Sequence, residues 1–98
     1  MAAYQRGDYT TALSELRALA EQGYAKAQFR LGVVYRKGLG VPQDYAQAHM
    51  WFDLAASKFS PGEDRDKAVN YRDRVAKIMT PAQISEAEKL ARGWRPKK

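Results

Sequence analysis

A chain of 98 residues, 45% of them hydrophobic, predicts one folded domain or a short array of repeats and excludes a separate catalytic domain. The sequence has no cysteine and no apolar run of membrane-spanning length, which excludes disulfides and thiolate metal sites and predicts no membrane span. The net charge of +6 comes from the two ends of the chain, because residues 43–79 hold six basic and six acidic groups. By itself this charge favours acidic proteins, nucleic acid and anionic lipid equally as partners.

The first half of the chain predicts a pair of helices over residues 8–22 and 25–37, separated by Gly23. In the second helix apolar residues recur at helical spacing, and Gly38 follows it, where a left-handed residue ends a helix at least cost. The chain starts at Met1 in what reads as the middle of a helix, so we expect a truncated first unit. Two cellular compartments are compatible with the sequence: the cytoplasm and, if a signal peptide was removed, the bacterial periplasm.

A third helix is predicted over residues 44–58, where Asp44 can cap the first turn and one side is apolar. This helix repeats the first one, because the pattern Asp-Tyr-x-x-Ala begins at residue 8 and again at residue 44. Each unit therefore reads as a helix, a turn that contains glycine and a second helix, which is the signature of a helical repeat.

Two further helices are predicted over residues 61–79 and 81–94. Each follows a residue whose hydroxyl group can cap it, Ser60 or Thr80. Each also begins with proline and has Glu or Gln three residues after the cap. The last helix is amphipathic, so we expect it to cap the stack, while residues 95–98 have nothing to bury and predict a frayed basic tail. The predicted fold class is all-α, an α-α superhelix of antiparallel helix pairs in a single domain over residues 1–94.

One stretch of residues carries a resemblance to a known family: Ala27, Leu31-Gly32, Tyr35, Gly38, Gly40-Val41, Asp44, Ala48, Trp51 and Ala55-Ala56. These residues, in this order, resemble a complete Sel1-like repeat of the bacterial type, a subclass of the tetratricopeptide-like helical repeats. The resemblance implies a truncated first repeat over residues 1–23, a complete repeat over 24–59 and a degenerate repeat or cap over 60–94.

The sequence departs from the repeat pattern at two places. The glycine usual after the Ala-Ala pair is replaced by Ser57-Lys58-Phe59, and Arg72-Asp73 stands where Leu31-Gly32 would align in the closing unit. Because of the second departure, we expect the closing unit to serve as a cap.

The resemblance implies an adaptor or scaffold for protein complexes and no enzyme activity. In tetratricopeptide-like stacks the first helix of each unit lines the concave face. Carried onto this sequence, that geometry places on the inner face Lys26, Phe29, Val33, Arg36 and Lys37, and in the closing unit Lys67, Asn70, Arg74 and Lys77. Such a strip suits an extended partner peptide with acidic and apolar side chains. The alternative is that Phe29 and Val33 only contact neighbouring helices while the cations are solvated.

The chemistry needed for catalysis is sparse in this sequence. The one histidine, His49, lies in the predicted helix 44–58, whose apolar side is already filled. The carboxylates of residues 63–66 lie in the first turn of the predicted helix 61–79, and its dipole explains them better than a calcium site does. Turn geometry explains the glycines of residues 38–40 better than a phosphate loop does. We expect Trp51 and Trp94 to pack in the core, and we expect no cofactor and no metal site.

Three other hypotheses compete with partner binding. A basic nucleic-acid-binding repeat is the main alternative, although the exposed aromatic residues needed for base stacking are not evident. A small hydrolase would depend on His49. Self-association would follow if the shortened first unit leaves apolar side chains uncovered.

Overall fold

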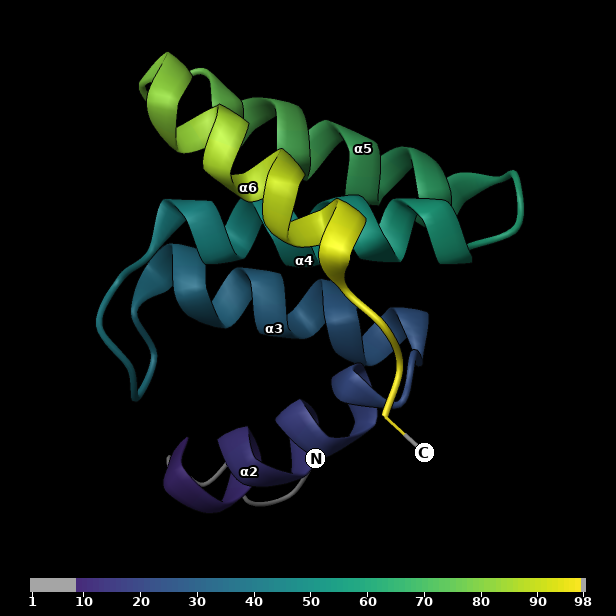
Figure 1. Ribbon diagram of the computed structural model, residues 1–98. Coiled ribbons are helices and arrows are strands. Elements are labelled where there is room, and N and C mark those ends of the chain that lie inside the picture. The colour runs from purple at the N-terminus through teal and green to yellow at the C-terminus, as the bar shows by residue number, and fades with distance from the viewer. Residues whose placement is uncertain (1–8, 98) are drawn as a thin grey trace.

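The computed structural model describes residues 9–97, and over that range every regular element is an α-helix (Figure 1). The elements in chain order are α2 (Tyr9–Glu21), α3 (Ala25–Lys37), α4 (Tyr45–Lys58), α5 (Glu63–Ala76) and α6 (Pro81–Gly93). Successive helices run antiparallel, which confirms the predicted all-α repeat fold. The part of the predicted first unit before residue 9 lies outside the described residues. None of the described helices is long and apolar enough to cross a membrane.

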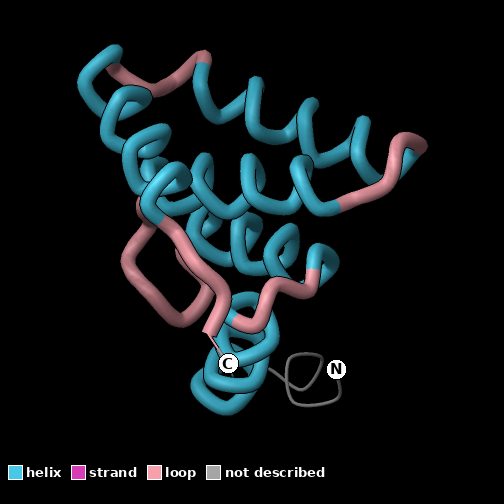
Figure 2. The backbone as a smooth tube through the Cα atoms, turned by 45° about the vertical axis from the view of Figure 1, so that its right-hand side comes forward, coloured by secondary structure: helices cyan, strands magenta, loops and turns pink. Residues whose placement is uncertain are grey.

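The centre of the fold is the contact between α3 and α4, which lie side by side in both views (Figures 1 and 2). At this contact Gly32 faces the fully buried ring of Phe52, and a Cβ atom added to Gly32 would lie only 2.6 Å from Phe52 Cε1. Glycine in the middle of a helix costs roughly 1 kcal/mol relative to alanine. The close approach of the two helices explains why glycine stands here.

The turn between α3 and α4 forms as the sequence predicts. Gly38 adopts the left-handed conformation with φ of 72°, and its N–H donates to the carbonyl oxygen of Val34 at 2.8 Å. At the other end, Asp44 caps α4 because its Oδ1 accepts from the N–H of Gln47 at 3.1 Å. Both predicted helix ends are therefore confirmed.

The core is built around α4, which contacts α3, α5 and α6. Trp51 on one side of α4 packs in a cluster with residues of α2 and α3, while Phe52 on the other side packs with residues of α5 and α6. Three small residues, Ala55, Ala56 and Ala68, form a third cluster where α4 meets α5. Since Trp51 is only 6% exposed, its predicted place in the core is confirmed.

Helix α5 is shorter than predicted, and its start differs from the expectation. The predicted span 61–79 reduces to Glu63–Ala76, and the N-cap is Gly62, with no side-chain cap, rather than Ser60. Gly62 has a φ of 152°, a conformation that interrupts the helix before Glu63. By contrast, the capping box of α6 is confirmed, because Thr80 Oγ1 accepts from Gln83 N–H at 3.1 Å and Gln83 Oε1 accepts from Thr80 N–H at 2.8 Å.

The prediction of a frayed C-terminal tail is wrong for residues 95–97. After α6 the chain turns back towards the end of α2 (Figures 1 and 2). The N–H of Lys97 donates to the carbonyl oxygen of Glu21 at 2.7 Å, and Lys97 Nζ lies 3.2 Å from Glu21 Oε2. The last carbonyls of a helix lack partners within the helix and attract cations, which explains why this segment docks there.

We expect Gly32→Ala to be less stable than Gly93→Ala by about 1–3 kcal/mol, because the new methyl group overlaps the Phe52 ring. A Cβ atom at Gly93, the last residue of α6, meets nothing within 4 Å, so Gly93→Ala is the matched control. Urea unfolding followed by circular dichroism measures both. Equal stability of the two variants would contradict the close α3–α4 approach.

Thr80 and Ser60 form a second matched pair, since both precede a proline but only Thr80 caps a helix. We expect Thr80→Ala to lose about 1 kcal/mol of unfolding free energy, the usual value of an N-cap, and Ser60→Ala to change it by less than about 0.5 kcal/mol. The same unfolding measurement applies, and a larger loss for Ser60→Ala would show that the Ser60 hydroxyl caps α5 after all.

Candidate protein-interaction surface

Helices α3 and α5 run in the same direction and both pack against α4 (Figure 1), and side chains from the two helices meet on one face of the molecule. Phe29 of α3 and Tyr71 of α5 touch across this face, with ring centroids 5.0 Å apart. We call this face the α3–α5 groove and define it by Lys26, Phe29, Arg36, Phe59, Asp64, Lys67, Tyr71 and Arg74.

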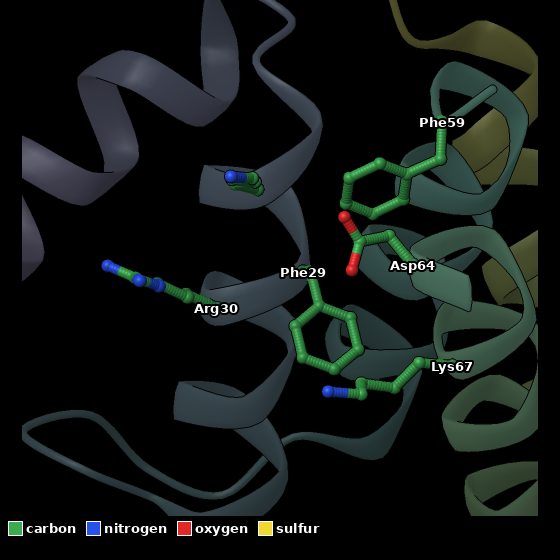
Figure 3. Close-up of a pocket in the computed structure, with 6 residues that line it drawn as sticks. Phe29, Arg30, Phe59, Asp64 and Lys67 are labelled. Atoms are coloured by element: carbon green, nitrogen blue, oxygen red, sulfur yellow. The ribbon is translucent and has the colours of Figure 1, made fainter. Parts of the chain in front are cut away.

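The end of the α3–α5 groove near the starts of both helices is hollowed into a depression of about 320 Å³. In the close-up, the rings of Phe29 and Phe59 face this space, with the Asp64 carboxylate between them and Lys67 beside Phe29, whereas Arg30 extends away from Phe59 (Figure 3). Lys26 also lines it. The depression therefore offers two aromatic surfaces within a rim of mixed charge.

The other end of the α3–α5 groove is organised by Tyr71. Its ring packs edge-on against the buried Phe52 at 5.7 Å between centroids, which fixes its place. The guanidinium carbons of Arg36 and Arg74 lie 5.7 and 5.6 Å from the centre of the same ring, a distance at which a cation is attracted to an aromatic face. Two arginines from different helices are thus held around one tyrosine.

The cations of the α3–α5 groove have no acidic partners within the described part of the chain. The ion pairs between described residues join Arg72 to Asp53 and Asp73, and Lys97 to Glu21. None of them involves Lys26, Arg36, Lys67 or Arg74. Arg36 Nε is also buried without a hydrogen-bond partner among residues 9–97. These four side chains can therefore attract acidic groups of a ligand.

Arg72 explains one departure from the repeat pattern. Its Nη1 lies 3.0 Å from Asp53 Oδ1, so it ties α5 to α4 through an ion pair, whereas the aligned Leu31 makes an apolar contact. Burial of Arg72 lowers its pKa, but the hydrogen bonds to Asp53 and Asp73 outweigh burial and raise the pKa overall. The arginine therefore stays charged. Because Asp53 is paired with Arg72, this carboxylate does not neutralise other cations.

The residues predicted for the inner face fall into four sets. The depression brings together Lys26, Phe29 and Lys67, and Tyr71 brings together Arg36 and Arg74. Val33 and Phe29 are both half-buried and pack against the cluster that contains Phe52, as the alternative interpretation expected, but Phe29 also lines the depression. The remaining predicted residues are exposed and belong to neither group: Lys37, Asn70 and Lys77.

Sequence reasoning missed three residues of this surface. Tyr71 follows Lys67 by four residues and precedes Arg74 by three, so helical spacing could have placed it on the same side as both. Phe59 lies where the repeat departs from its pattern, and that departure was a usable signal. Asp64 was assigned to the first turn of a helix, and its position beside Phe59 depends on the loop before α5, which the sequence does not specify.

The hydrolase hypothesis depends on His49, which lies in α4. His49 is only 5% exposed, and its Nδ1 makes no hydrogen bond to residues 9–97. No group of three or more His, Cys, Asp or Glu side chains within the described range could hold a metal ion.

The comparisons with known proteins agree with the repeat fold. The family model described as Sel1 repeat matches residues 25–58, which span α3, the turn and α4. Two relatives, both named DAP3-binding cell death enhancer 1, come from Rattus norvegicus and Mus musculus, and each is 43% identical over 42 residues. The match covers 43% of this chain but only 8% of each relative, so the chain spans less than a tenth of their length. No solved structure matches.

We expect His49 to make the stability of the protein depend on pH. Burial lowers the pKa of His49 from its ordinary value of 6.5, and this effect outweighs the nearby Asp53 carboxylate, which raises it. The unfolded chain therefore binds a proton more readily than the folded one. The contribution of neutral His49 to stability is complete above pH 6.5 and is lost as the pH falls from there towards the lowered pKa.

The measurement is the unfolding free energy of the wild type and of His49→Gln between pH 5 and 8. Because carboxylates titrate in both proteins, the difference between the two curves isolates the histidine. We expect that difference to change with pH below about 6.5, the ordinary histidine pKa. A constant difference across the range would show that His49 is not buried as the structure has it.

Proposed function

The chain carries a Sel1 repeat at residues 25–58, and from that premise we propose that it is a non-catalytic adaptor or scaffold module that binds a partner protein or peptide in the α3–α5 groove. The observation that carries the proposal is the combination of accessible aromatic surface at Phe29 and Phe59 with cations that have no acidic partner among the described residues. Interfaces are enriched in aromatic residues and arginine, which matches this composition.

The named relatives support partner binding in general terms. Their name describes a protein that binds another protein. The Sel1 repeat match includes α3, which supplies one side of the α3–α5 groove. Since only 8% of each relative is matched, the partner of the relatives is not transferred to this chain.

A protein partner accounts for the surface better than nucleic acid does. Bases stack on accessible aromatic faces, whereas Tyr71 is half-buried between Arg36, Arg74 and the core, and Asp64 places a negative charge beside Phe59. If single-stranded RNA or duplex DNA bound this chain at low salt with a steep salt dependence, the nucleic-acid alternative would replace the proposal.

The proposal predicts where a selected peptide will bind. A random peptide library displayed on phage is selected against the wild-type chain, and the enriched peptides are added to labelled protein while backbone amide chemical shifts are recorded. We expect the largest shifts at Phe29, Lys67 and Tyr71. Shifts confined to α2 or to α6 would contradict the proposed surface.

Two charge-reversal variants sharpen this test. Lys67→Glu should weaken binding of the selected peptides by about fivefold or more, since it replaces an attraction worth up to about 1 kcal/mol by repulsion. Arg65→Glu is the control, because Arg65 precedes Arg74 by nine residues, or two and a half helical turns, and so lies on the opposite side of α5. Equal weakening by both variants would indicate an effect of net charge alone.

A further inference from the structure

Building on the proposed function, we propose that the partner segment binds the α3–α5 groove as an extended strand that carries an apolar side chain and an acidic side chain three residues apart. The apolar side chain enters the depression beside Phe29 and Phe59, and the carboxylate binds between Arg36 and Arg74.

The order of the two groups follows from the charges along the α3–α5 groove. The Asp64 carboxylate lies between the two phenyl rings, so a carboxylate placed against these rings would meet it, while an apolar side chain can lie there with Lys26 and Lys67 at the rim (Figure 3). Arg36 and Arg74 stand at the other end around Tyr71, with no carboxylate paired to them among the described residues. Guanidinium groups bind carboxylates through paired hydrogen bonds, and packing on an aromatic ring orients them beforehand.

The distance between the two ends comes from the helices themselves. Phe29 and Arg36 are seven residues apart on α3, and Lys67 and Arg74 are seven residues apart on α5. At 1.5 Å per residue, each interval is about 10 Å along the helix axis. In a polyproline-type extended strand, residues three apart lie on the same side and about 9 Å from each other, which fits this interval.

The floor of the α3–α5 groove favours an extended strand over a helix. The rings of Phe29 and Tyr71 touch across it, with centroids 5.0 Å apart, so the two helices leave no open channel between them. An α-helix with its side chains is about 10–12 Å wide and has no room to enter, whereas an extended strand can lie along the seam.

The experiment compares three synthetic peptides of the same composition. Each peptide carries one leucine and one glutamate in a background of glycine and serine. The two residues stand three, one or seven positions apart, and seven is the spacing that a bound helix would need. Binding is measured by chemical-shift titration of the wild-type chain. We expect the three-residue spacing to bind about fivefold tighter than either other spacing, with shifts at both Phe29 and Tyr71.

The arginines are tested by variants that leave the core intact. Arg36→Ala combined with Arg74→Ala should weaken the peptide with three-residue spacing about tenfold and abolish its preference over the other spacings. Tyr71→Phe keeps the ring and should bind as the wild type does, and Arg65→Ala controls for lost charge. Circular dichroism checks that each variant is folded.

Several results would overturn the inference: equal binding of all three spacings, tightest binding at seven residues, or wild-type binding by the Arg36 and Arg74 double variant. If library-selected peptides still shift α3–α5 groove residues while the designed peptides do not, the inference fails and the proposed function stands. If peptides of no composition shift these residues, both fail.

Discussion

The close contact between Gly32 and the Phe52 ring fixes the distance between α3 and α4, and the rest of the structure is built outward from it. Phe52 is fully buried, yet its ring also packs against Phe29 at 5.4 Å and against Tyr71 at 5.7 Å between centroids. The same side chain that joins the two helices of the repeat therefore supports the floor of the α3–α5 groove. A change in the helix spacing would move both Phe29 and Tyr71.

The cations of the α3–α5 groove lack acidic partners because the acids that form ion pairs among the described residues are paired with other cations. Asp53 and Asp73 are engaged by Arg72, which secures α5 to α4, and Glu21 is engaged by Lys97. The ion pairs between described residues therefore involve other side chains than the cations of the α3–α5 groove. Because desolvating an unpaired cation is costly, Lys26, Lys67 and Arg74 remain at the surface, whereas Arg36 is half-buried.

Sequence patterns predicted the helices well where the signals were local. The spans of α3 and α4 match their predicted bounds, because Gly38 and Asp44 end and cap helices through contacts within a few residues. The start of α5 was missed, since Ser60 has the same sequence pattern as Thr80 and only the backbone conformation of Gly62 separates the two cases. The docking of the tail depends on contacts between residues far apart in the chain, which spacing along one helix does not report. Tyr71 could have been placed beside Lys67 and Arg74 by helical spacing, but its contact with Phe29 could not.

The docked segment after α6 has a consequence for how the molecule comes apart. Stacks of helical repeats contact only their neighbours in sequence, so their end helices tend to detach one at a time. Here Lys97 is fastened to Glu21, and Trp94 packs edge-on against Trp51 with ring centroids 6.2 Å apart. The last helix is therefore joined to the first described one across the central repeat. A contact of this kind opposes the loss of α6 alone, because detaching α6 would also break the contacts of Lys97 with Glu21 and of Trp94 with Trp51.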